Sequence, residues 1–198
     1  PPLGQRIAVA RDAAFSFIYP HVLEGWYSAG STLEFFSPLD DQGPTKEADA
    51  VYLPGGYPEL HARSLATNMV FRDAMLTARD RGAAIFGECG GYMVLGEQIE
   101  IEKGEKYPML GFLPVKTSFV KQGLSLGYRK VKTTSASLLG HKGTTFFGHE
   151  FHYAMAVVEK EAQPLFEVTN AVGRDIGKMG LVVRLVAGSF IHLIDCSR

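Results

Sequence analysis

Cysteine is scarce in this chain of 198 residues, which holds two cysteines, one tryptophan and no marked excess of either charge. Two cysteines argue against a disulfide scaffold and are typical of a reducing compartment, so we expect the cytoplasm. The formal net charge of −1 indicates neither a nucleic-acid partner nor an acidic membrane surface. Long hydrophobic runs are also missing, because even residues 181–194 are interrupted by Arg184 and His192, and no membrane-spanning helix is predicted.

The length and the overall composition of the chain are those of one globular domain. Hydrophobic residues make up 46% of the chain and charged residues 21%, which is ordinary for a soluble protein. A chain of this length can bury one full hydrophobic core. The opening residues 1–5 have the composition of a linker, so we expect them to be the remnant of an interdomain linker and residues 6–198 to form the domain.

Short apolar runs alternate with helical patterns in the first half of the chain. Buried strands are predicted at residues 6–10, 32–37, 48–53 and 83–86. Helices are predicted at residues 19–30 and around Phe71, Met75 and Ala78, which are spaced for one helix face. This alternation predicts an α/β fold with a mostly parallel sheet and helices on both faces. Ligands of such sheets bind beyond the carboxyl ends of the strands.

The second half has a different composition. It is rich in β-branched and aromatic residues and has little helical periodicity. We therefore expect extra strands and β-hairpins, added to the parallel sheet or packed against it. The segments concerned are residues 109–120, 126–135, 144–158 and 180–194.

The segment "GECGGYMVLG" at residues 87–96 places Cys89 between a predicted buried strand and a short helix. This order resembles a nucleophile elbow, in which a sharp turn needs small neighbours such as Gly87, Gly90 and Gly91. The start of the helix is expected to favour the thiolate of Cys89. The N–H of Gly90 would then face an oxyanion. The alternative is that Cys89 is a small buried apolar residue with no chemical role.

A second glycine-rich loop, "LPGGYPE" at residues 53–59, follows the preceding predicted strand. Gly55 and Gly56 could offer main-chain N–H groups as further oxyanion donors. Loops rich in proline and glycine are common, however, so an ordinary turn is the alternative.

The thiol also needs a base, and His192 is the best placed of six histidines. It lies at the end of a near-continuous apolar run, where a buried strand would leave the core. In "GHEFH", an extended strand would put Glu150 and His152 on one face and His149 on the other. Glu150 and His152 could form a pocket wall or a structural hydrogen-bonded pair. A metal site would need more ligands than they supply.

Five ordered motifs together carry a family resemblance: "LPGGYPELHA", "GECGGYMVLG", "LGYRK", "GHEFHYA" and "GSFIHL". They resemble the glutamine amidotransferase domains of the cobyrinic and hydrogenobyrinic acid a,c-diamide synthases, over nearly the whole chain. The resemblance implies the class I, triad-type amidotransferase fold. It also implies that Cys89 is the nucleophile, that His192 is the base, and that Gly55, Gly56 and Gly90 form the oxyanion hole.

The activity implied by this resemblance is glutamine hydrolysis to glutamate and ammonia through a Cys89 thioester. The ammonia would serve the ATP-dependent amidation of the a and c carboxylates of the corrinoid. The domain would thus be the glutaminase half of a carbon–nitrogen ligase. Its partners would be glutamine and an N-terminal synthetase domain that binds the corrinoid, ATP and Mg²⁺. No metal or cofactor is expected in the present domain.

The sequence offers two candidates for the third catalytic residue. Many triad amidotransferases carry an acid two residues after the histidine, but that position is Ile194 here. Asp195 would point to the opposite face of the strand from His192. We therefore expect a Cys–His dyad, with Glu150 as the candidate orienting acid and Asp195 as a weaker one.

The substrate is expected to contact Glu88, His152 and Tyr92, although Glu88 could instead point away from the thiol. Two other functions remain open. A hydrolase or peptidase with the same elbow would turn over peptides or esters without a need for glutamine. A catalytically silent docking domain would leave Cys89 unlabelled by glutamine analogues.

Overall fold

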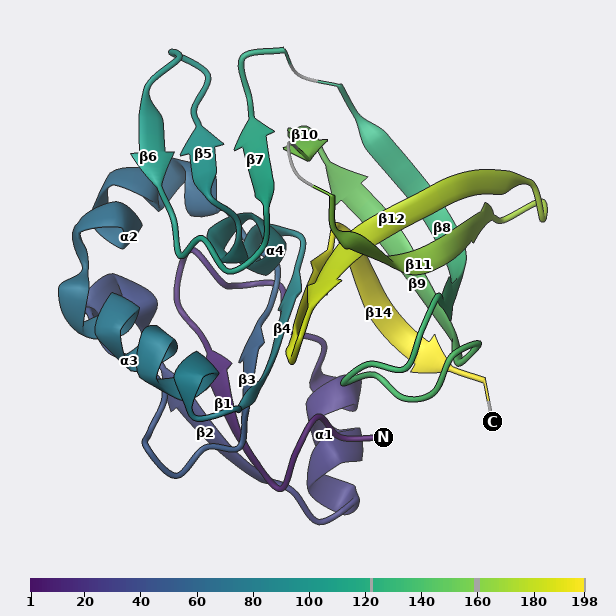
Figure 1. Ribbon diagram of the computed structural model, residues 1–198, viewed down its shortest axis with the longest axis horizontal. Coiled ribbons are helices and arrows are strands. Elements are labelled where there is room, and N and C mark those ends of the chain that lie inside the picture. Colours follow the sequence, from purple (N-terminus) through teal and green to yellow (C-terminus); the bar gives the residue numbers. More distant parts are fainter. Residues whose placement is uncertain (122, 159–160, 198) are drawn as a thin grey trace.

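A ten-stranded sheet runs through the whole molecule, with helices on both of its faces (Figure 1). The structure is a computed structural model, and it describes residues 1–121, 123–158 and 161–197. The strand order is β14-β9-β8-β11-β12-β13-β4-β3-β1-β2. A smaller sheet has the order β10-β7-β5-β6.

The first half of the chain forms four of the five strands in the parallel part of the large sheet, as the alternating pattern predicted, and β13 from the second half adds the fifth. Strands β1, β2, β3, β4 and β13 pair in parallel, and buried residues dominate β1, β3 and β4 because helices cover both faces. Pro20 begins α1, where a missing N–H costs nothing. The elements are β1 (Arg6–Ala10), α1 (Pro20–Ser28), β2 (Thr32–Phe36), a 3₁₀ helix (Pro38–Asp40), β3 (Ala50–Leu53), a second 3₁₀ helix (Pro58–His61), α2 (Ala62–Thr67), α3 (Met69–Asp80), β4 (Ala84–Glu88) and α4 (Gly90–Leu95).

The second half forms strands throughout, which confirms the predicted hairpins. Antiparallel pairs join β8 to β9, β8 to β11, β11 to β12 and β9 to β14. The sequence did not predict that β5, β6, β7 and β10 would form a separate sheet. The strands are β5 (Gln98–Glu100), β6 (Lys106–Pro108), β7 (Val115–Ser118), β8 (Ser125–Thr133), β9 (Thr145–His152), β10 (Met155–Val158), β11 (Gln163–Asn170), β12 (Asp175–Val183), β13 (Val186–Ser189) and β14 (Ile191–Cys196).

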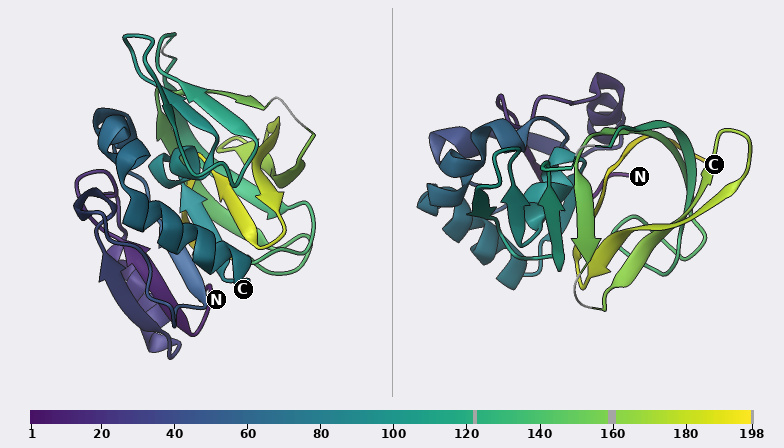
Figure 2. Two further views of the ribbon diagram at one scale, coloured as in Figure 1. Left: turned by 60° about the vertical axis from the view of Figure 1, so that its left-hand side comes forward. Right: turned by 90° about the horizontal axis from the view of Figure 1, so that it is seen from above.

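The antiparallel part of the large sheet curls strongly, as the view from above shows (Figure 2). Strand β14 stands at one end of the strand order, yet the N–H of Leu193 on β14 donates to the Glu88 carboxylate at the end of β4, at 3.0 Å. The curl therefore returns β14 to the carboxyl end of β4, where the predicted site lies.

Two apolar cores fill the two faces of the sheet. One contains residues of α2, α3 and α4, among them Phe71, Met75 and Leu95. The other lies under α1, whose Leu23 and Trp26 pack against it. Within the described ranges, no helix is both long enough and apolar enough to cross a membrane.

Candidate active site

Cys89 occupies a strained turn between β4 and α4. Its backbone angles are φ 48° and ψ −104°, and the residue is only 3% exposed. A positive φ in a residue other than glycine typically costs about 1–3 kcal/mol and persists where the surrounding structure enforces it. The geometry is the sharp strand-to-helix turn that the sequence predicted.

The glycines of this turn allow very close main-chain packing. A Cβ atom on Gly91 would overlap the carbonyl oxygen of Leu53 and lie 2.6 Å from its carbonyl carbon. A Cβ atom on Gly87 would lie 2.7 Å from the carbonyl carbon of Gly91. No side-chain movement relieves such contacts, because the atoms belong to the main chain. Strand β3, strand β4 and helix α4 can therefore meet only if these positions are glycine.

The loop after β3 brings Gly56 beside Gly90, the first residue of α4. A Cβ atom on Gly90 would lie 3.0 Å from the main-chain nitrogen of Gly56. Among the described residues, no main-chain carbonyl accepts from the N–H groups of Gly56 and Gly90. The loop is held by its other atoms, since Phe17 N–H donates to the Gly55 carbonyl at 2.9 Å. Two neighbouring N–H groups are thus left without a main-chain acceptor, and that of Gly90 interacts with the Cys89 sulfur, as expected for an oxyanion site.

His192 and Cys89 meet at Gly55. A Cβ atom on Gly55 would overlap Cε1 of His192 and lie 3.2 Å from its Nδ1 and 3.3 Å from Cβ of Cys89. His192 is 1% exposed, and its Nδ1 has no hydrogen-bond partner among the described residues. The His149 ring stacks on it, with centroids 4.8 Å apart and an interplanar angle of 9°. The absence of a side chain at Gly55 therefore leaves the space in which the base approaches the thiol, and its role as an oxyanion donor stays a prediction.

Burial keeps both groups neutral in the resting site. It raises the pKa of the Cys89 thiol to about 12, against the opposing effect of the Gly90 N–H. Burial, followed by the neighbouring His149 and His152, lowers the pKa of His192 to about 3. The Gly90 N–H at the start of α4 lowers the pKa of the thiol, as expected, but desolvation of the buried sulfur outweighs this effect in the resting site. The thiol faces the Phe151 carbonyl oxygen at 3.8 Å, and the neutral imidazole can accept a proton.

Glu150 belongs to a buried ion-pair cluster on β8 and β9. Its carboxylate accepts from Nε of Arg129 at 2.7 Å and lies 3.0 Å from Nε2 of His152. Burial alone would raise the pKa of Glu150, but His152 and Arg129 outweigh it and lower the pKa. The described contacts of Glu150 do not include His192. Within the described ranges, no group of three or more histidine, cysteine and acidic side chains is arranged for a metal ion.

Asp195, the weaker candidate acid, lies outside the site. It is exposed, and its carboxylate accepts from the N–H of Cys196 at 2.8 Å. A register irregularity in the pairing of β14 with β9 lies between Leu193 and Asp195.

The three expected substrate contacts lie in different places. His152 lines the small cavity at Cys89, together with Phe17, Gly56, Tyr57, Glu59, Met93, Phe119, Phe151 and Tyr153. Glu88 instead lines a cavity under α1, and Tyr92 packs edge-on against Phe190 in the core. The cavity at Cys89 has a volume of about 40 Å³. Tyr57, Phe151 and Tyr153 line it and are half-exposed.

Sequence reasoning missed three residues near the thiol. Glu59 lines the Cys89 cavity, and burial raises the pKa of its carboxyl. Tyr19 is hydrogen-bonded to Nε2 of His149, the ring that stacks on His192. Glu59 had a signal in the sequence, because it lies three residues after Gly56 in the same loop, and His149 lies in the "GHEFH" segment, but neither was given a role. The contacts of Tyr19 and His149 depend on long-range packing.

Known proteins resemble this chain both in sequence and in fold. The hydrogenobyrinate a,c-diamide synthases of Sinorhizobium sp and Rhodobacter capsulatus are 55% and 49% identical to it, and each match covers 98% of the chain. The matched part is 44% of each relative, so the chain spans less than half the length of these proteins.

Solved structures confirm the α/β fold. A chain from the structure of PurLQS from Thermotoga maritima matches with a TM-score of 0.62 and 16% identity, over 94% of this chain and 86% of that chain. A crystal structure of glutamine amidotransferase gives a TM-score of 0.58 and 16% identity, over 96% and 90%. The family model described as the CobB/CobQ-like glutamine amidotransferase domain matches residues 6–198. The chain therefore belongs to the CobB/CobQ-like glutamine amidotransferase domain family.

Proposed function

We propose that this domain hydrolyses glutamine and supplies the ammonia to a synthetase that amidates the a and c carboxylates of hydrogenobyrinic acid. The observation that carries the proposal is the convergence of Cys89 and His192 at Gly55, beside the available N–H groups of Gly56 and Gly90. The acceptor follows from the names of the relatives. The two cysteines are free, which is consistent with a reducing cytoplasm.

The reaction begins from the neutral pair. As the Cys89 sulfur attacks the side-chain amide carbon of glutamine, the thiol proton passes to His192. The carbonyl oxygen becomes an oxyanion that the Gly56 and Gly90 N–H groups stabilise; one such donor is typically worth about 3–4 kcal/mol of barrier. His192 then donates its proton to the nitrogen, the C–N bond breaks and ammonia leaves. His192 next takes a proton from water, which attacks the thioester carbon. The C–S bond then breaks, His192 returns the proton to the Cys89 sulfur, and glutamate leaves.

The amidation itself would occur on a part of the protein beyond this chain. ATP and Mg²⁺ do not fit the described residues, which lack a carboxylate cluster for a metal, and the sequence has no phosphate-binding loop. The relatives are more than twice as long as the matched segment, which supports a separate synthetase domain. No step of the amidation is therefore assigned to this domain.

A glutamine analogue that alkylates its nucleophile tests the proposal directly. Incubation with 6-diazo-5-oxo-norleucine should label Cys89, as mapped by mass spectrometry, and excess glutamine should protect it. Labelling of Cys196 alone, or of neither cysteine under conditions that label an established glutaminase, would contradict the proposal. Turnover of peptides or esters with no protection by glutamine would instead favour a peptidase with the same elbow.

Glu59 is expected to bind the α-ammonium group of glutamine. It is an acidic residue of the Cys89 cavity, and its partly buried carboxyl would gain an opposite charge when the substrate binds. Glu59→Gln should raise KM for glutamine about 10-fold and change kcat by less than about 2-fold, as expected for the loss of one ion pair. Steady-state glutaminase assays measure both constants. Glu24→Gln on the exposed surface of α1 is the control, and an unchanged KM in Glu59→Gln would exclude this role.

A further inference from the structure

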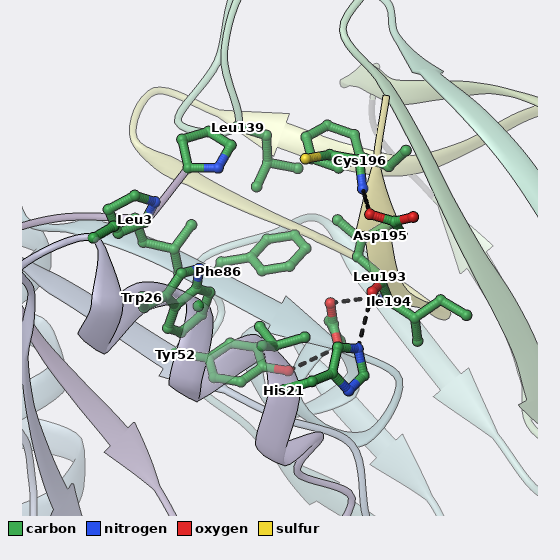
Figure 3. Close-up of a pocket in the computed structure, with 17 residues that line it drawn as sticks. Leu3, His21, Trp26, Tyr52, Phe86, Leu139, Leu193, Ile194, Asp195 and Cys196 are labelled. Carbon is green, nitrogen blue, oxygen red and sulfur yellow. Dashed lines mark hydrogen bonds between the residues drawn. The ribbon is translucent and has the colours of Figure 1, made fainter. Parts of the chain in front are cut away.

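Glu88 is the residue immediately before the nucleophile, and its side chain turns away from the Cys89 cavity. It is 2% exposed and lines a cavity of about 330 Å³ beneath α1, with Tyr52 and Trp26 among its neighbours. One carboxylate oxygen accepts from the Tyr52 hydroxyl at 2.8 Å, and the other accepts from the N–H of Leu193 at 3.0 Å. Both hydrogen bonds are drawn in Figure 3.

The bond to Leu193 joins two strands that are not neighbours in the sheet. Glu88 ends β4 in the parallel part, whereas Leu193 belongs to β14 at one end of the strand order, 105 residues away. Among the described residues, β14 pairs with β9 alone and stands at the end of the strand order. On its unpaired edge, Leu193 N–H donates to Glu88, and the Ile194 carbonyl lies 2.9 Å from Nε2 of His21. Two side chains thus replace the missing strand partner at this edge.

The N–H that Glu88 holds belongs to the peptide unit that joins His192 to Leu193. The carbonyl oxygen of the same unit packs against Gly148 on β9, where a Cβ atom would overlap it. The unit is therefore held on both sides, by a carboxylate and by a close main-chain contact. Because the imidazole extends from the adjoining Cα atom, this restraint sets where the base lies relative to Cys89.

We propose that Glu88 is a positioning residue that couples the nucleophile segment to the base segment through the main chain of His192 and Leu193. This inference rests on the proposed glutaminase function. Glu88 touches neither the thiol cavity nor the substrate in this role. Tyr52, on the neighbouring strand β3, orients the carboxyl by its hydroxyl. Burial raises the pKa of Glu88 to about 8, against the opposing effects of the Leu193 N–H and the Tyr52 hydroxyl.

Two substitutions separate positioning from folding. Glu88→Met keeps the length of the side chain and suits the apolar surroundings, but it offers Leu193 no acceptor. Its kcat for glutamine hydrolysis should fall about 100-fold, the usual effect of a small misplacement of a catalytic group. KM should change less than about 3-fold. Glu88→Gln keeps an amide oxygen for the Leu193 N–H and should retain kcat within about 10-fold of the native value.

The readouts are kcat, KM and the rate at which diazo-oxo-norleucine labels Cys89 in the full-length protein. Asp41→Ala is the matched control, because Asp41 also holds a main-chain N–H, that of Phe71 in α3. The inference is supported if Glu88→Met loses kcat and labelling rate while Glu88→Gln and Asp41→Ala keep them. It is overturned if Glu88→Met keeps kcat, or if Glu88→Gln is impaired as strongly as Glu88→Met. Native protein that fails to label would overturn the proposed function instead.

Discussion

Replacing Cys89 by serine is expected to lower glutamine-dependent amidation by the full-length protein at least about 10⁴-fold, while amidation with added ammonia stays within about 2-fold. A serine hydroxyl fits the same strained turn, but it is a much poorer nucleophile beside a neutral imidazole. Losses of this size are typical when the nucleophile of a catalytic pair is removed. Product formation with each nitrogen source, measured on the same preparation, gives both numbers.

The comparison of the two nitrogen sources serves as the internal control for folding. Unfolding temperature should be unchanged in Cys89→Ser, because the side chains are close in size. Loss of both activities would make Cys89 a structural residue. Retention of the glutamine-dependent activity would mean that another group attacks the amide.

Replacing Gly91 by alanine is expected to destabilise the domain by at least about 3 kcal/mol. The new Cβ atom would overlap the carbonyl oxygen of Leu53 on β3, and α4 would have to move away from the sheet. Overpacking against main-chain atoms belongs to the most damaging class of substitutions. In thermal unfolding, a loss of 3 kcal/mol corresponds to a fall in Tm of about 6–12 °C for a domain of this size.

Gly25→Ala provides the matched comparison for Gly91→Ala. Gly25 lies within α1, and a Cβ atom there would meet nothing within 4 Å. Alanine is a better helix former than glycine by roughly 0.5–1 kcal/mol, so this variant should be slightly more stable than the native protein. Equal Tm values for the two variants would mean that α4 can shift freely on the sheet.

The parallel half of the fold was predictable because its signals are local. The apolar run at residues 6–10 is strand β1 without change, and the spacing of Phe71, Met75 and Ala78 marks the buried face of α3. The turn at Cys89 was predictable for the same reason, since strand, glycines and helix are adjacent in the sequence. His192 was predicted as the base because it lies at the end of an apolar run.

The contacts that organise the site could not be predicted, because they depend on the curl of the sheet. Arg129 reaches Glu150 only through the register of β8 on β9, and no pattern in either strand specifies that register. Glu88 was expected either to meet the substrate or to point away, and its partner Leu193 lies 105 residues along the chain. The burial of Cys89 could not be predicted from the sequence either, and its effect on the thiol pKa outweighs that of the Gly90 N–H.

The return of β14 to β4 also has a consequence for the order of folding. The nucleophile turn is built from neighbouring segments, whereas the base arrives only when the curled sheet closes over a long loop. Contacts between residues so far apart in the sequence generally form late, because closing the long loop between them has an entropic cost that earlier contacts must offset. A newly made or partly folded chain would therefore carry a protonated, unassisted thiol. We expect no hydrolysis of glutamine until the sheet has closed, so that ammonia is released only by fully folded molecules.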